Sequence, residues 1–443
     1  MNKLLAGICQ LDITPSVGIR LAGYPHFPRE NIGFHDPLCV TSMYISDCAT
    51  EFVFTTLDIL FFSKKYVRAV RERVFNECGI PERNIMISCS HTHSGPWASG
   101  NPELDATAGD SADIDPEYLE HLLGQIVKSV LNAKNTAFPA EIAFASALCG
   151  AESGVGGNRQ HKDGITDPYV NIVAVRDEQK TIKGILTNYA LHPTFLHEDS
   201  LLVSADYPHY LRSFLTEKYP DAVVGFAQGA SGDQSSRYFR QGQSFDEAER
   251  VGRIMGKAAA EAIENMCFTD TAKLVHEYIE LPIPIREYPS IAELEEKVRV
   301  RTQRYENLKA EGASYLDIQN ANLYMLGAED MLGYAICVKN GKRVDLLEDE
   351  NPAEISVFRI GDNVIVGSQG ECFVEYALKI RKNSIAANTY VFCIANGCLP
   401  GYCVNDAAYE EDGYEAGNCM LAPGFGDIIA ENALRLISEV FNI

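Results

Sequence analysis

Short apolar runs alternate with amphipathic segments along the first third of the chain. Residues 51–61 (EFVFTTLDILF) and 84–90 (NIMISCS) are typical of buried strands. Residues 63–79 and 115–136 carry apolar side chains every three or four positions, which predicts helices. Strands separated by helices indicate an α/β fold.

The same alternation continues to the C-terminal end. Apolar runs that read as strands or as strand-to-loop transitions occur at residues 184–194, 222–233, 354–360, 363–370 and 389–396. Helical patterns occur at residues 246–266, 290–332 and 427–441. The region at about 290–335 is a helical insertion, broken near Gly312, that forms either an outer hairpin or a wall of a substrate cleft. Because no repeat or linker interrupts the pattern, we predict mixed β-sheets flanked by helices in a single compact domain, residues 1–443.

Charge and cysteine content limit the partners and the cellular compartment that we expect for this protein. The 443 residues include 38 basic and 61 acidic side chains, a formal net charge of -23. Such a charge repels phosphate backbones and anionic lipid surfaces, so we expect no nucleic-acid partner. No run approaches the ~20 apolar residues of a membrane span, and we identify no secretory signal. Thirteen cysteines, an odd number, fit a reducing compartment, so we expect a cytoplasmic protein.

Two histidines end one of the predicted strands. His91 and His93 lie in the stretch MISCSHTHSGPW, and alternate residues of a strand point to the same side. Two neighbouring imidazoles are a common beginning of a metal site. The turn after them lies where α/β proteins place ligand sites. His192, before Pro193 at another strand end, is either a third nitrogen ligand or a buried hydrogen-bonding side chain.

Three further segments carry candidate chemistry, each with a structural alternative. Glu371 lies between a strand and a helix, where a carboxylate ligates a metal or simply stabilises the helix N-terminus. Residues 226–236 (FAQGASGDQSS) form a Gly/Ser turn that suits an oxyanion, or a plain loop, and lack the G-x-S-x-G spacing of serine hydrolases. Tyr402 and Tyr414 belong to a Gly-rich loop, where tyrosines usually pack and hydrogen-bond.

Taken in order, these segments resemble the catalytic domain of the neutral (non-lysosomal, alkaline) ceramidases. The resemblance extends from about residue 6 to about residue 430 and is carried by ICQLDITPSVGIRLAGYP, FHDPL, SHTHSGP, NYALHPT, SADYPHY, GASGDQSS and GYCVNDAAYEEDGYEAG. Seven motifs in the family's order are far more specific than any single motif. Full-length ceramidases carry an immunoglobulin-like domain after the catalytic one, and we expect that domain to be absent here.

The resemblance implies a zinc enzyme with a defined ligand set. The positions that match the family's zinc ligands are His91, His192, Glu371 and Tyr402. Zinc with few protein ligands retains a water whose pKa it lowers toward ~7, and this water attacks an amide carbonyl.

The resemblance also implies catalytic roles around the zinc. His93 passes a proton to the leaving nitrogen, while Tyr414 and Ser235 donate hydrogen bonds to the oxyanion. Arg159 orients a polar group of the substrate.

Some positions depart from the family, and they affect the expected substrate more than the reaction. Trp97 replaces a glycine after the His-Ser-Gly-Pro motif and alters the pocket mouth, and Gln160 replaces a serine beside Arg159. We therefore expect a zinc-dependent hydrolase of linear amide bonds. Its substrate is a small-molecule N-acyl amide, either ceramide, within sphingolipid metabolism, or a smaller and more soluble compound.

Three alternatives remain open from the sequence. A TIM-barrel metal-dependent amidohydrolase also begins with H-x-H on a strand. A metal–sulfur or redox-regulated protein would use Cys393, Cys398, Cys403 and Cys419. The third alternative is a catalytically inactive binding protein on the same scaffold.

Overall fold

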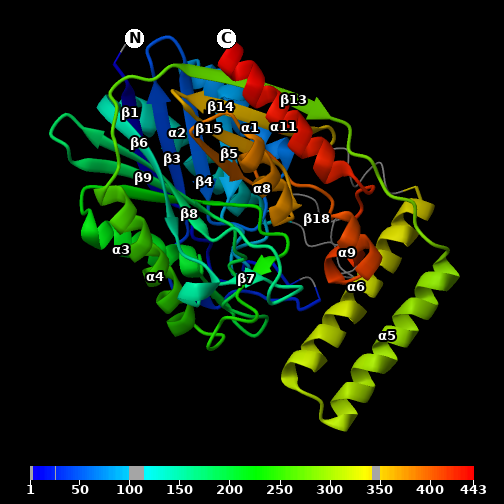
Figure 1. Cartoon of the computed structure of the whole chain (residues 1–443). Coiled ribbons are helices and arrows are strands. Elements are labelled where there is room, and N and C mark those ends of the chain that lie inside the picture. The colour runs from blue at the N-terminus through cyan, green and yellow to red at the C-terminus, as the bar shows by residue number, and fades with distance from the viewer. Residues whose placement is uncertain (1–2, 25, 99–113, 342–349) are drawn as a thin grey trace.

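Two β layers form the centre of the protein in a computed structural model, which describes residues 3–24, 26–98, 114–341 and 350–443 (Figure 1). The first layer contains β1 (Leu5–Asp12), β3 (Cys39–Ser46), β4 (Glu51–Leu57) and β5 (Ile85–Cys89). The second contains β6 (Phe138–Leu148), β8 (Tyr169–Asp177), β9 (Ile182–Tyr189) and β11 (Val223–Gln228). Together they have the order β11-β9-β8-β6-β1-β3-β4-β5.

The two layers are joined at one corner and pack against each other. β1 and β6 pair only through Leu5 and Ala6, whereas β11 contacts β3, β4 and β5 across the interior. The interior between them is apolar and includes Met43, Phe54 and Leu186. The mixture of parallel and antiparallel pairs excludes the eight-stranded parallel barrel of the TIM-barrel alternative.

A separate four-stranded sheet extends the first layer. Its strands, in the order β13-β14-β15-β17, are β13 (Leu274–Leu281), β14 (Ala353–Ile360), β15 (Asn363–Ser368) and β17 (Asn388–Phe392). The backbone N–H of Cys89 donates to the carbonyl of Ile394, and that of Asn396 donates to the carbonyl of Ile87. These bonds join the end of β5 to the segment that follows β17.

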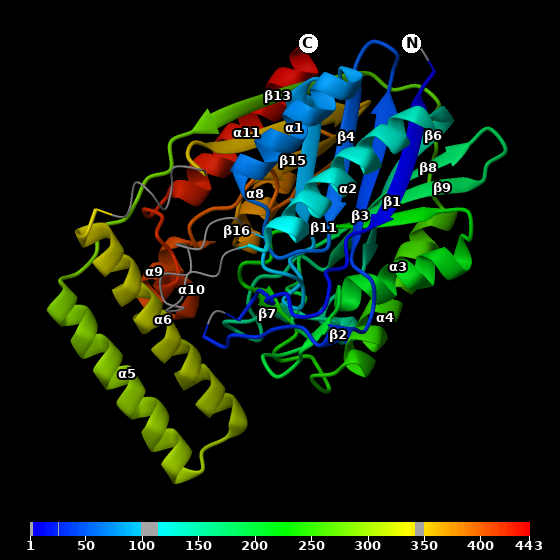
Figure 2. The same ribbon diagram turned by 180° about the vertical axis from the view of Figure 1, so that it is seen from behind.

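Helices cover both outer faces, as the amphipathic patterns predict. On one side lie α1 (Lys64–Cys78), α2 (Pro116–Asn135), α8 (Val374–Asn383) and α11 (Phe425–Asn442) (Figure 2). The other side carries α3 (Tyr207–Lys218) and α4 (Phe245–Glu264). Each set buries its apolar stripe in a separate cluster, one with Val53 and Val364 and the other with Ile185 and Phe226. The predicted class, mixed sheets flanked by helices, is confirmed.

The predicted insertion is a helical hairpin that projects from the layers (Figure 1). It consists of α5 (Ile291–Glu311) and α6 (Tyr315–Lys339), separated by Gly312 with φ +67°, a left-handed conformation that suits glycine. α6 packs on the short helix α10 (Tyr414–Gly417). A Cβ on Gly327 would lie 2.8 Å from the Cα of Tyr414, so the close approach requires glycine.

The carboxyl ends of several parallel strands meet at one edge. β4 is parallel to β5, β9 to β11, and β15 to β17. In open α/β sheets, ligands bind outside such carboxyl ends. Among the described helices, none combines the length and apolar character needed to cross a bilayer.

Candidate functional site

His91 and His192 come from the ends of two strands in different layers. β5 ends at Cys89, two residues before His91, and β9 ends at Tyr189, three residues before His192. His91 has φ +66°, an uncommon conformation for a residue with a side chain, and such strain clusters at functional sites. The two Nε2 atoms lie 3.3 Å apart, and both side chains are buried.

Backbone carbonyls fix the orientation of both imidazoles. His91 Nδ1 lies 3.1 Å from the carbonyl of Leu60, and His192 Nδ1 lies 2.8 Å from that of Ser231. A carbonyl oxygen can only accept, so each Nδ1 carries the proton. In the neutral rings, both Nε2 atoms therefore present lone pairs to each other. Burial, with the charge of Arg159, lowers the pKa of His192 to about 4, so its ring is neutral at pH 7.

Glu371 joins the two histidines through a small parallel pair of strands. β16 (Glu371–Cys372) pairs with β18 (Tyr402–Cys403), which places Glu371 opposite Tyr402. The Oε2 of Glu371 lies 2.9 Å from His192 Nε2 and 3.2 Å from His91 Nε2. Burial opposes ionisation, yet the histidines hold the pKa of Glu371 well below its usual value.

The donor set of these three side chains fits a divalent metal. Two imidazole lone pairs and a carboxylate oxygen converge within hydrogen-bond distance, without a proton to share between them when the rings are neutral. Such an arrangement is repulsive unless a cation lies between the atoms. Two histidines and one carboxylate are also ligands that zinc uses in catalytic sites.

His93 lies beside this cluster. Its Nε2 is 3.4 Å from His91 Nε2, and the ligand atoms of His91, His93 and His192 all lie within 4.8 Å of one another. Burial and the two neighbouring imidazoles hold the pKa of His93 well below its usual value. A Cβ on Gly23, which has φ +99°, would lie 2.6 Å from the His93 Cβ, so this loop approaches the imidazole without space for a side chain. The geometry allows His93 either to ligate or to exchange protons.

A second pair of short strands places Arg159 beside Ser235. β7 (Gly157–Asn158) is antiparallel to β12 (Gln234–Ser235), and the Arg159 N–H donates to the carbonyl of Asp233. The Arg159 Nη1 lies 3.4 Å from His192 Nε2, and its buried Nη2 has no hydrogen-bond partner among the described residues. Ser235 lines the same cavity as Arg159.

Two tyrosines, Tyr402 and Tyr414, also belong to this site. The Arg159 guanidinium lies 5.0 Å from the centre of the Tyr402 ring, and the rings of Tyr402 and Tyr414 are 6.0 Å apart. Burial raises the pKa values of both phenols, so both are protonated donors at neutral pH in the metal-free protein.

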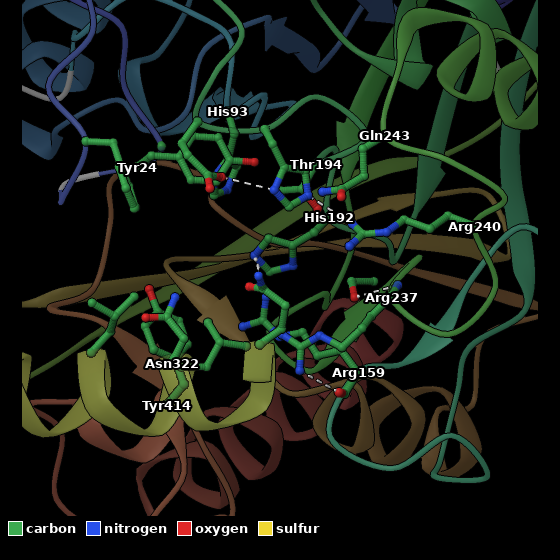
Figure 3. A pocket seen from close by; sticks show the side chains of 18 of the residues that line it. Tyr24, His93, Arg159, His192, Thr194, Arg237, Arg240, Gln243, Asn322 and Tyr414 are labelled. Atoms are coloured by element: carbon green, nitrogen blue, oxygen red, sulfur yellow. Dashed lines mark hydrogen bonds and ion pairs between the residues drawn. The ribbon is translucent and has the colours of Figure 1, made fainter. Parts of the chain in front are cut away.

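Two cavities meet at the histidines, and Figure 3 shows side chains that line the larger one. The larger, about 440 Å³, contacts His93, Arg159, His192, Ser235, Tyr402 and Tyr414, and α6 forms one wall of it. The smaller, about 110 Å³, contacts His91, Glu371 and several apolar side chains, which include Leu60, Phe61, Trp97 and Leu399. The hairpin therefore both projects outward and walls the cleft, and Trp97 lines the smaller cavity.

Two carboxylates that the sequence pattern does not single out hold the site together. Glu415 accepts from Arg159 Nε at 2.7 Å and from Gln160 Nε2 at 3.0 Å. Asp233 accepts from Asn158 and from the backbone N–H of Val374 at the start of α8. Burial raises the pKa of Asp233 to about 6. In the sequence, the only indication of a role for Glu415 and Asp233 is that they directly follow Tyr414 and Gly232, in motifs from which other residues were chosen as candidates.

Comparison with known proteins agrees with this geometry. The sequence model of the family described as "Neutral/alkaline non-lysosomal ceramidase, N-terminal" matches residues 4–250, more than half of the chain. The chain belongs to this family. Membership places it among hydrolases that act on amide bonds. A curated relative, the neutral ceramidase of Pseudomonas aeruginosa, is 20% identical over 475 residues, which cover 94% of this chain and 69% of the relative.

Solved ceramidase structures share the fold. The neutral ceramidase of Pseudomonas aeruginosa aligns with a TM-score of 0.74 at 17% identity, covering 99% of this chain and 75% of its own. A ceramidase complexed with C2 aligns with a TM-score of 0.76 at 15% identity, covering 100% of this chain and 76% of its own. Within the described residues, His91, His93 and His192 form a group of side chains with spacing suitable for a metal ion.

Proposed function

We propose that the protein is a zinc-dependent amidohydrolase that cleaves an N-acyl amide, either ceramide or a smaller N-acyl compound. The observation that carries the proposal is the convergence of His91 Nε2, His192 Nε2 and Glu371 Oε2 within 3.3 Å of one another. With both imidazoles neutral, three lone pairs meet in a buried place without a proton between them, and a bound cation would relieve their repulsion. The family relationship supports the amide-hydrolase class.

The proposed zinc ligands are His91, His192, Glu371 and Tyr402. When bound, zinc supplies a Lewis acid and a water of lowered pKa. Nδ1–H bonds to backbone carbonyls hold the two imidazoles in the required tautomer, an arrangement that typically accompanies metal-ligating histidines. Of the four proposed ligands, Tyr402 has the least geometric support. This support consists of the strand pairing with Glu371 and the 6.3 Å distance between its ring and that of His192.

The remaining side chains act on the substrate. His93 has a buried Nδ1 without a partner in the described chain and an Nε2 that faces the cluster, so it is placed to carry a proton to the leaving nitrogen. Tyr414 donates its phenolic hydrogen, and Ser235 its hydroxyl hydrogen, to the carbonyl oxygen as negative charge develops. The free Nη2 of Arg159 holds a polar group of the substrate.

The test combines metal content with product formation. Purified protein is stripped with a chelator, reloaded with zinc, and assayed by mass spectrometry against ceramide and against shorter N-acyl amines. We expect amine release that depends on zinc, one zinc per chain, and loss of both zinc and activity in His91→Ala and His192→Ala. His121→Ala, which removes an exposed histidine on α2, is the matched control and leaves both unchanged.

Two results would contradict the proposal. Full zinc stoichiometry in both histidine variants would place the metal elsewhere. Zinc binding without any amine product would favour the alternative of an inactive binding protein.

We also propose that the chain acts as one domain in the cytoplasm. The proposed ligands come from residues 91 to 402 and from both β layers, so neither layer holds the site alone. All thirteen cysteines are unpaired, which fits a reducing compartment.

A further inference from the structure

Two arginines that the proposed mechanism does not use line the larger cavity. Arg237 and Arg240 follow β12 and lie on the same side of the pocket, whereas Asn322 lies on the side formed by α6 (Figure 3). Both side chains are half-buried. With Arg159, they give the described residues that line this cavity three guanidinium groups and a single carboxylate, that of Glu198. This local excess of positive charge contrasts with the net charge of -23 of the whole chain.

The hydrogen bonds of Arg237 leave most of its donors available. Its Nη1 donates to the carbonyl of Arg159 at 2.9 Å, and no carboxylate within the described chain forms an ion pair with it. Burial and the charges of Arg159 and Arg240 lower its pKa, while Glu415 opposes this shift. Glu415 already accepts hydrogen bonds from Arg159 and Gln160.

Arg240 is similarly free of a direct carboxylate partner. Its Nη1 lies 3.0 Å from His197 Nε2, whose other nitrogen lies 3.1 Å from Glu198. Glu198 is 40% exposed and forms no ion pair with Arg240 in the described chain, although its charge and that of Glu247 act on the guanidinium from a distance. Both guanidinium groups therefore face the cavity with unused donors.

A neutral substrate would be a poor occupant of this cavity. A bound ligand excludes water, and a charged group that loses water without gaining a partner costs free energy. An anion in the same place would receive charge-assisted hydrogen bonds from planar guanidinium groups, which match a carboxylate in shape. The arginines therefore discriminate in favour of a negatively charged ligand.

The position of the arginines indicates which half of the substrate carries the charge. Arg159 connects them to the proposed metal, because its guanidinium lies 3.4 Å from His192 while its carbonyl accepts from Arg237. On the other side of the histidines, the smaller cavity presents Leu60, Phe61, Trp97 and Leu399, which suit an acyl group. Arg20 also lines this cavity, with its guanidinium 5.8 Å from the centre of the Trp97 ring. The amine half then extends toward the arginines.

We propose, on the basis of the proposed amidohydrolase function, that the substrate is an N-acyl amine whose amine half carries a carboxylate bound by Arg237 and Arg240. The substrate class is thus an N-acyl amino acid. Hydrolysis adds water across the amide bond: the C–N bond breaks, a C–O bond forms, and the products are a fatty acid and a free amino acid.

A matched pair of substrates tests this proposal. N-hexanoylglycine and N-hexanoylethanolamine share the acyl chain and differ by a carboxylate in place of a CH2OH group; N-hexanoyl-β-alanine extends the carboxylate by one carbon. We expect kcat/KM for the better of the two anionic substrates to exceed that for the ethanolamine conjugate by roughly 10- to 100-fold, the size of a hydrogen-bonded charge pair. Arg237→Gln and Arg240→Gln each reduce this ratio about tenfold or more.

A control variant removes an arginine outside the cavity, and two kinds of outcome would contradict the proposal. Arg253→Gln removes an exposed arginine of α4, paired with Glu217, and leaves the ratio unchanged. A wild-type ratio near one, or a ratio that neither cavity variant alters, would overturn the proposal. Preference for N-succinyl propylamine, which carries its carboxylate on the acyl half, would overturn the assignment to the amine half.

A binding measurement separates this proposal from the proposed function. Chelator-treated protein is titrated with each compound by calorimetry, so no turnover is required. Tighter binding of the anionic compounds, lost in Arg237→Gln and Arg240→Gln, supports the anion site even if the protein hydrolyses neither substrate. Hydrolysis of both substrates at equal efficiency, with equal binding, would retain the amidohydrolase function and reject the anion site.

Discussion

Removal of the charge on Glu415 tests whether a buried ion pair positions the substrate-binding arginine. Glu415 accepts from Arg159 Nε at 2.7 Å, and the two side chains are 5% and 8% exposed. The Glu415→Gln substitution preserves the shape and an acceptor oxygen but leaves the guanidinium without its direct counter-charge. Breaking a buried pair in this way typically costs about 3–5 kcal/mol. Because the amide oxygen can still accept and Glu371 is nearby, we expect the lower end, about 3 kcal/mol.

The effect on stability has a defined pH dependence. Burial opposes ionisation of Glu415, but the charge of Arg159 lowers its pKa below the ordinary value. A carboxylate with a lowered folded-state pKa stabilises the protein above its unfolded pKa of about 4.3 and loses that contribution as pH falls through the folded value. The difference between wild type and Glu415→Gln is therefore full at pH 7 and shrinks below about pH 4.

Urea unfolding measures the stability change, and steady-state kinetics measures its functional consequence. We expect kcat/KM to fall about 10- to 100-fold with zinc content unchanged, because Arg159 is displaced while the ligands remain. Glu415→Asp keeps the charge and recovers part of the activity. Glu217→Gln, at an exposed pair with Arg253, changes the free energy of unfolding by less than about 0.5 kcal/mol. A Glu415→Gln variant of wild-type stability and activity would refute the positioning role.

Four further changes address other parts of the site. Tyr414→Phe retains zinc and slows the chemical step about 10²-fold or more, and an unchanged single-turnover rate would remove its oxyanion role. His93→Ala retains zinc but loses about 10²- to 10⁴-fold in kcat, whereas loss of zinc would make His93 a ligand. Gly23→Ala, at φ +99°, displaces His93 and lowers both activity and the free energy of unfolding, the latter by about 1–3 kcal/mol; wild-type values in both assays would show that the loop adapts. Saturating zinc at about 1,000 times its Kd stabilises the stripped protein by about 4 kcal/mol in urea unfolding, and no change would argue against a folded-state site.

The hydrophobic pattern predicted most of the fold because secondary structure and burial leave a periodic signal. The helices at residues 115–136 and 427–441, the hairpin broken at Gly312, and the strands that end before His91 and His192 all occur as expected. The pairing of two layers through the corner at Leu5 and Ala6 could not be predicted, because strand order depends on contacts between distant segments.

The candidate site was only partly visible in the sequence. His91 and His192 stood out because imidazoles at strand ends are chemically distinctive, and the family resemblance added Glu371 and Tyr402. Glu415, Arg237 and Arg240 were not singled out, because their function depends on partners up to 256 positions away. A charged residue in a loop carries no local sign that it is buried.

The central claim is that a single zinc ion joins side chains from both β layers. Crystals of the zinc-loaded protein, measured on either side of the zinc absorption edge, locate the ion by its anomalous scattering. We predict one strong peak between the Nε2 atoms of His91 and His192 and the carboxylate of Glu371. A peak located at the cysteines, or no peak near these three side chains in protein that is active with zinc, would contradict the account.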